Sequence, residues 1–113
     1  MTHYLISFPA AAMQVPPHEL PAVGDAARAV VREAKAAGVY VFAGGIHSGV
    51  APLRVQGDGH AGPNTDPAAQ NLDGGFCVLK LPTRDAAVQW AAKIAAACRC
   101  AQELREFAHD PES

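Results

Sequence analysis

Two residues in the middle of the chain have the types that general acid–base chemistry needs. His47 follows Gly44 and Gly45 at the end of an apolar run, and Asp66 lies in a segment without periodicity. A neutral imidazole oriented by a carboxylate is an effective general base near neutral pH. The alternative is structural, because such a histidine can bond to the backbone and an aspartate before a proline often caps a turn. Both interpretations stay open at this point.

Arg54 carries the side chain best suited to holding a substrate carboxylate, because its guanidinium presents a planar fork of N–H donors. It alternates with Leu53 and Val55 along a short apolar run. Successive side chains of a strand point to opposite faces, so the arginine faces either a cleft or the solvent. Arg54 is therefore a candidate ligand-binding residue, with a solvent-exposed position as the alternative.

The residue spacing gives little support to metal or redox chemistry. Asp58 and His60 lie beside an Asp-Gly turn, and with the histidine and aspartate above they match no compact metal-ligand motif. Three cysteines, an odd number, do not suggest a disulfide framework. Cys98 and Cys100 would share one face of a strand near Cys77, and buried inert thiols are more common than reactive ones. We expect no metal and no cofactor.

The size and charge of the chain restrict the class of protein. Its 113 residues suit one domain, which we place at residues 1–108, with a polar tail at 109–113. A net charge of −2 argues against nucleic-acid binding, which requires a basic face. No apolar run approaches the roughly 20 residues of a membrane span, and the first residues lack the basic segment of a signal peptide. We therefore expect a cytoplasmic protein without membrane contacts.

The first half of the chain predicts three strands and one helix. Alternation predicts a strand over residues 2–8, and a nearly continuous apolar run predicts a central strand over residues 39–43. Between them, residues 20–37 follow the helical period, and Gly38 suits the position just after a helix. A short third strand is expected at residues 53–56. Four charged residues of the helix fall on its solvent side: Asp25, Arg28, Arg32 and Lys35.

The second half predicts a loop and then a strand, a helix and a strand. Residues 60–73 show no periodicity, and a loop of this length is often functional. Residues 76–81 form an apolar run of strand length. Thr83 is suited to cap a helix in which Trp90 would anchor the core or line a pocket. Residues 99–107 alternate like a strand.

This order of elements predicts an α+β fold of the ferredoxin-like, split βαβ type with an antiparallel sheet. Both helices would cover one face of the sheet. The core has little bulk, because aromatic residues make up only 6% of the chain and much of its apolar share is alanine. The other face would then need a cover, which a second copy of the chain would supply as a symmetric homodimer.

The residues of this chain resemble a known family. The segment QWAAKIAAACRCAQELREF, preceded by GGF and LPTRDAA, is similar to the YCII-related family in its DGPF-domain branch. Gly-Val at residues 38–39, Gly-Gly-Ile-His at 44–47 and Arg-Val at 54–55 also match the family pattern. The signature itself differs, because residues 64–68 read Asn-Thr-Asp-Pro-Ala where the family shows Asp-Gly-Pro-Phe.

The resemblance implies a dimeric α/β barrel with a cleft between helix-free sheet faces and loops, whose polar centre would be His47 and Asp66. It implies either a small-ligand-binding or regulatory protein associated with a sigma factor, or an enzyme similar to lyases and isomerases of small organic acids. In the enzyme, His47 would act as acid and base, Asp66 would orient it and Arg54 would hold the acid. The altered signature favours the binding or regulatory role.

Overall fold

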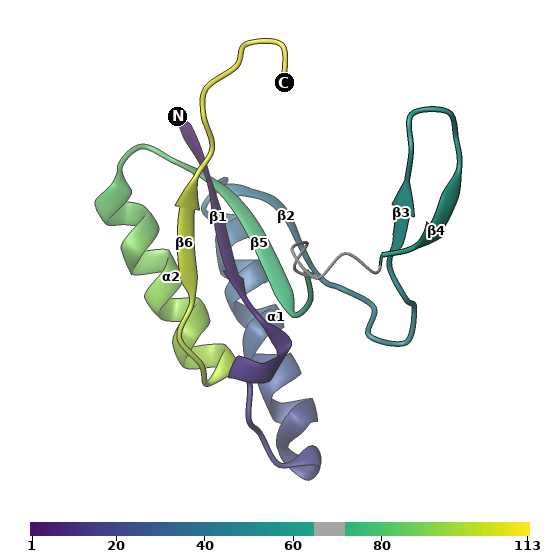
Figure 1. Cartoon of the computed structure of the whole chain (residues 1–113). Coiled ribbons are helices and arrows are strands. Elements are labelled where there is room, and N and C mark those ends of the chain that lie inside the picture. Colours follow the sequence, from purple (N-terminus) through teal and green to yellow (C-terminus); the bar gives the residue numbers. More distant parts are fainter. Residues whose placement is uncertain (65–71) are drawn as a thin grey trace.

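The computed structural model describes residues 1–64 and 72–113 of the chain (Figure 1). These residues form two α-helices, two short 3-10 turns and six strands. In chain order the elements are β1 (Thr2–Phe8), η1 (Ala10–Ala12), η2 (Pro17–Glu19), α1 (Leu20–Ala36), β2 (Tyr40–Gly45), β3 (Leu53–Val55), β4 (Ala61–Pro63), β5 (Gly75–Leu81), α2 (Arg84–Cys98) and β6 (Glu103–Glu106).

Four of the strands form an antiparallel sheet in the order β2-β5-β1-β6. The two central strands, β1 and β5, are apolar along most of their length and pair over seven positions, with Ile6 opposite Cys77. When the β3–β4 hairpin is set aside, the connectivity is strand-helix-strand twice, and the strand order is that of a ferredoxin-like sheet. The predicted α+β class and antiparallel sheet are therefore confirmed.

Both helices pack on the same face of this sheet (Figure 1). The core lies between the layers and is centred on Ile6, Leu79 and Leu81, the largest fully buried side chains. Ala34 of α1 and Ala87 of α2 are buried in the same cluster. One residue in two along β1 and β5 therefore points to the helices, as the alternation predicts.

Local chemistry fixes the ends of the helices as the sequence indicates. The Thr83 hydroxyl accepts a hydrogen bond of 3.1 Å from the backbone N–H of Ala86, which is an N-cap. Gly38 follows α1 with a φ of +74°, a conformation that costs glycine little. The helices are also linked to each other by ion pairs, Lys93 to Glu33 and, at 2.8 Å, Arg99 to Glu19. Their side chains are between 38% and 51% exposed, so these pairs contribute little free energy to the fold.

Two sequence-based predictions about elements are wrong. Residues 61–63 form strand β4, although they lie inside the expected loop at residues 60–73. The cysteines do not share a strand face, because Cys98 is the last residue of α2 and Cys100 lies in the turn that follows. A left-handed Arg99, with a φ of 57°, makes this turn, so the last strand begins only at Glu103.

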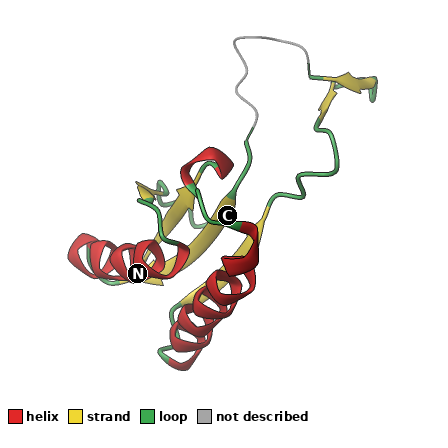
Figure 2. Ribbon diagram, turned by 90° about the horizontal axis from the view of Figure 1, so that it is seen from below, coloured by secondary structure: helices red, strands yellow, loops and turns green. Residues whose placement is uncertain are grey.

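The β3–β4 hairpin extends away from the rest of the molecule. It pairs only within itself and stands apart from the four-stranded sheet and the helices in both views (Figures 1 and 2). Its Leu53 and Val55 are each 66% exposed. The radius of gyration, 15.9 Å, exceeds the value of about 13 Å expected for a compact chain of this length. The hairpin is therefore an arm of the molecule and not a part of its core.

The sheet face opposite the helices carries a row of apolar residues across three strands. Val78 of β5 lies next to Leu5 of β1 on one side and Phe42 of β2 on the other. Phe42 is 60% exposed, and neither helix covers this face. We call these three residues the helix-free row.

Neither α1 nor α2, which are the α-helices of the described residues, is long and apolar enough to cross a membrane.

Candidate functional site

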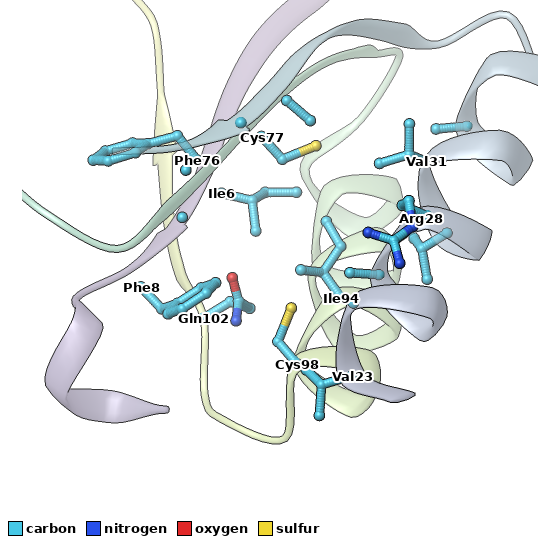
Figure 3. Close-up of a pocket in the computed structure, with 18 of the residues that line it drawn as sticks. Ile6, Phe8, Val23, Arg28, Val31, Phe76, Cys77, Ile94, Cys98 and Gln102 are labelled. Carbon is cyan, nitrogen blue, oxygen red and sulfur yellow. The ribbon is translucent and has the colours of Figure 1, made fainter. Parts of the chain in front are cut away.

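A cavity of about 550 Å³ lies between the helices and the sheet (Figure 3). Its walls come from β1, β2, β5, α1 and α2 and are almost entirely apolar. The lining residues that matter below are Ile6, Phe8, Gly24, Ala27, Arg28, Val31, Ala43, Cys77, Trp90, Ile94, Cys98 and Gln102. A concave apolar space with a few polar groups is the usual form of a small-molecule site.

The cavity exists because small residues stand where α1 passes over β2. Ala27 and Ala34 form part of the inner surface of α1, and β2 ends in Ala43, Gly44 and Gly45. These residues have methyl groups or hydrogen atoms where a filled core would have branched or aromatic side chains. The buried core, whose Ile6 and Leu79 also border the cavity, is therefore not filled at this end of the sheet.

One end of the cavity is built where β1 leaves the sheet and β5 enters it. The Phe8 ring lies directly over Gly75, since a Cβ there would come within 2.6 Å of the ring. Gly74, with a φ of +83°, has no room for a side chain against the Phe8 carbonyl. The Asp73 carboxylate accepts a hydrogen bond of 2.9 Å from the Ala10 N–H, which ties the chain after β1 to this corner.

Arg28 is the charged residue among the described residues that line the cavity. Its guanidinium lies over Gly24, since a Cβ at that glycine would be 3.3 Å from both terminal nitrogens. Its Nη2 donates to a carboxylate oxygen of Asp25 at 2.6 Å. In the close-up the guanidinium is drawn on the α1 side, near Val31 and facing Ile94 (Figure 3). It is thus a cation at the rim of an apolar space.

The other polar groups of the lining are an amide, two thiols and the Tyr40 hydroxyl, which accepts a hydrogen bond of 3.2 Å from the Ala43 N–H. The side-chain N–H of Gln102 donates to the Cys100 carbonyl at 3.3 Å. Burial, together with a smaller effect of the nearby Cys98, raises the pKa of Cys77 to about 11. Burial, and then the proximity of Cys100, also raises the pKa of Cys98. Both lining thiols are therefore protonated near neutral pH, which makes them poor nucleophiles and poor metal ligands.

Trp90 gives the cavity a spectroscopic reporter. It is the single tryptophan of the chain, it is half-buried, and it lines the cavity from α2. The two roles considered for it from the sequence, core anchor and pocket wall, are both met, because it also packs against the buried core. The Lys93 ammonium lies over the Trp90 ring, 5.2 Å from the ring centroid.

The structure places His47 outside this cavity. It lies in the exposed loop after β2, and its Nδ1 accepts a hydrogen bond of 3.0 Å from the Gly49 N–H. This is the structural role considered for it from the sequence. Asp66, its predicted partner, lies outside the described residues, so the pairing of the two stays a prediction.

Arg54 lies on β3, in the extended hairpin, and is exposed. Its neighbours in the hairpin ladder are the residues of β4, with Arg54 opposite Gly62. It does not line the cavity described above, so the structure does not bring Arg54 and the cavity together. Within residues 1–64 and 72–113, no group of three histidine, cysteine or acidic residues is placed to hold a metal ion.

Arg28 was not predicted as a site residue from the sequence, because the helical period places this arginine on the solvent side of α1. The side chain is indeed 64% exposed, yet its long stem allows the guanidinium to fold back along the helix to the rim of the cavity. The sequence does contain one signal. Gly24 is an unfavourable residue inside a helix and lies about one turn before Arg28, on the same face of α1.

No family model matches the sequence, and no curated protein matches it significantly.

The raised thiol pKa values predict how stability depends on pH. Between pH 9.0 and about 11 the unfolded chain loses the Cys77 proton before the folded chain does, so the free energy of unfolding falls as the pH rises. We expect this fall to be smaller by about 3 kcal/mol in Cys77→Ala, because the folded and unfolded pKa values of the thiol differ by about 2 and a difference of 1 corresponds to about 1.4 kcal/mol. Urea unfolding of both proteins at several pH values measures the difference. Parallel pH profiles would contradict the burial of this thiol.

Proposed function

We propose that this protein binds a small ligand with a largely apolar body in the cavity between α1, α2 and the sheet. The observation that carries the proposal is the cavity itself, whose volume of about 550 Å³ lies in the range of about 300–1,000 Å³ typical of ligand sites. The walls of this space are almost entirely apolar, so an apolar ligand gains free energy when it removes them and its own surface from water.

The chemistry of the lining favours binding over turnover. None of the described residues that line the cavity carries an imidazole or a carboxylate. These are the groups that most often act in general acid–base catalysis, and burial raises the pKa of the lining thiols Cys77 and Cys98, so neither thiol is a ready base near neutral pH. The enzyme alternative would therefore depend on His47 and Asp66, at a place separate from the cavity, and it stays a prediction.

We further propose that the chain is a YCII-related protein and acts as a homodimer. The sheet order β2-β5-β1-β6 and the two helices on one face are compatible with the ferredoxin-like protomer that the sequence resemblance implies. The resemblance is also the sole support for a regulatory role beside a sigma factor.

The proposed dimer interface is the helix-free row. Leu5, Val78 and Phe42 are neighbours across three strands, on the sheet face opposite the helices. A second copy presents the same row, so two sheets packed face to face would cover both rows through a two-fold axis. Apolar side chains gathered on one face in this way are typical of interaction surfaces.

A cavity-filling substitution tests the ligand site. Ala27→Phe places a ring in the cavity, whereas Ala29→Phe places the same ring on the exposed side of α1. With 1-decanol as an uncharged apolar probe, we expect the wild type to bind with a change in Trp90 fluorescence. We expect Ala27→Phe to bind about tenfold more weakly or worse, because the space is occupied. Ala29→Phe is expected to bind like the wild type.

Thermal melts of both variants show whether each is folded before it is titrated. A folded Ala27→Phe protein that binds 1-decanol as tightly as the wild type would overturn the proposed site. Failure of the wild type to bind the probe would overturn the proposed function itself.

A charged substitution in the helix-free row tests the dimer. We expect light scattering to give the wild type a mass twice that of the 11.7 kDa chain. Phe42→Glu puts a carboxylate into the helix-free row and is expected to give a monomer, because burying an unpaired charge is costly. The matched control, Val88→Glu, changes a residue of α2 that is 52% exposed and is expected to remain a dimer. A monomeric wild-type protein would contradict the proposal.

A further inference from the structure

We propose that the ligand of the cavity carries a single carboxylate, which Arg28 binds while the aliphatic or aromatic body lies against the apolar walls. This inference rests on the proposed ligand-binding function, and it names the class of ligand as an apolar monocarboxylate, such as a medium-chain fatty acid. The observation behind it is that a guanidinium borders a lining that is otherwise apolar or uncharged over its described residues.

The position of the guanidinium depends on Gly24. The terminal nitrogens of Arg28 lie 3.3 Å from the point where a Cβ would stand on that glycine, so the side chain folds back over the helix backbone. Glycine inside a helix costs about 1 kcal/mol relative to alanine. Gly24 has a helical conformation and not a left-handed one, so its backbone does not require glycine. Because Gly24 has no side chain, it leaves room for the Arg28 guanidinium at the edge of the cavity.

Asp25 orients the guanidinium without occupying all of its donors. Its carboxylate contacts Nη2, and the Asp25 side chain is 77% exposed and does not line the cavity. A guanidinium has further N–H groups arranged for a second carboxylate, and it is not deprotonated near neutral pH. An incoming carboxylate would therefore meet a fixed cation with donors left to bond it.

The same lining argues against more highly charged ligands. A phosphate or a dicarboxylate needs several cations or a set of backbone N–H groups to replace its hydration. Gln102 and Tyr40 are uncharged polar side chains of the lining, and each is already hydrogen-bonded to the backbone: the Gln102 N–H donates to the Cys100 carbonyl, and the Tyr40 hydroxyl accepts from the Ala43 N–H. One anionic end and an apolar remainder are what this arrangement can accommodate.

The test compares two probes that differ in their head group alone, decanoate and 1-decanol, at a pH where the acid is ionised. Trp90 fluorescence reports the binding of both. We expect decanoate to bind the wild type about fivefold more tightly than the alcohol, the upper end of what an exposed ion pair contributes. In Arg28→Gln we expect that preference to disappear while the affinity for the alcohol is kept. Arg32→Gln, one turn further along α1 and away from the lining, is the matched control and is expected to keep the preference.

The outcomes separate this inference from the proposed function. If the wild type binds 1-decanol and decanoate equally, or if Arg28→Gln keeps the preference for the acid, the carboxylate site is wrong although the cavity still binds apolar ligands. If neither probe binds, the proposed function fails with it.

Gly24→Ala gives a second, independent readout. The added Cβ would lie 3.3 Å from both terminal nitrogens, so we expect it to move the guanidinium by a few tenths of an ångström and to reduce the preference for decanoate over 1-decanol. The same substitution is expected to raise the melting temperature, because alanine is the better helix residue and the displaced side chain is flexible. A variant that is more stable and keeps the full preference would show that Gly24 does not position Arg28, and would count against the inference.

Discussion

The arrangement of this protein depends on a shortage of bulky side chains where α1 crosses the end of β2. The centre of the sheet is closely packed around Ile6, Leu79 and Leu81, which are almost completely buried. Toward Ala43 and the two glycines that follow it, the side chains become too small to fill the space below α1. The tight centre maintains the fold, and the sparse end leaves a cavity.

The two faces of the sheet have different surroundings as a consequence. On the helix face, the small residues leave an internal space with an arginine at its rim. On the opposite face, the helix-free row of Leu5, Val78 and Phe42 has no layer over it. The alanine-rich composition suggests from the sequence alone that the core has little bulk, and it predicts a cover on the open face. The structure adds that small residues also leave a cavity on the face that the helices cover.

Much of the frame could be predicted from local signals. Alternation defines β1, the Thr83 cap defines the start of α2, and Gly38 marks the end of α1, because each depends on residues close in sequence. β4 gave no such signal, since three residues with the sequence Ala-Gly-Pro have no alternation to detect and form a strand only by pairing with β3. The cysteines were misplaced for a similar reason, because α2 continues to Cys98 and only a left-handed Arg99 ends it.

The candidate site was harder to predict than the frame, because a cavity is a property of packing between distant segments. The sequence pointed to His47, Asp66 and Arg54, residues whose types suggest chemistry. The structure places His47 and Arg54 in an exposed loop and an extended hairpin, and Asp66 lies outside the described residues. Arg28 looked like an ordinary surface residue, and only the tertiary structure shows that its guanidinium reaches the edge of an apolar space.

The most direct test of the central claim is to locate a bound probe by nuclear Overhauser effects between decanoate and the methyl groups of the protein. The account predicts effects to Ile6, Val31 and Ile94, whose side chains line the space between the helices and the sheet. Effects confined to Ile46 beside His47, or to Leu53 and Val55 on the hairpin, would contradict it.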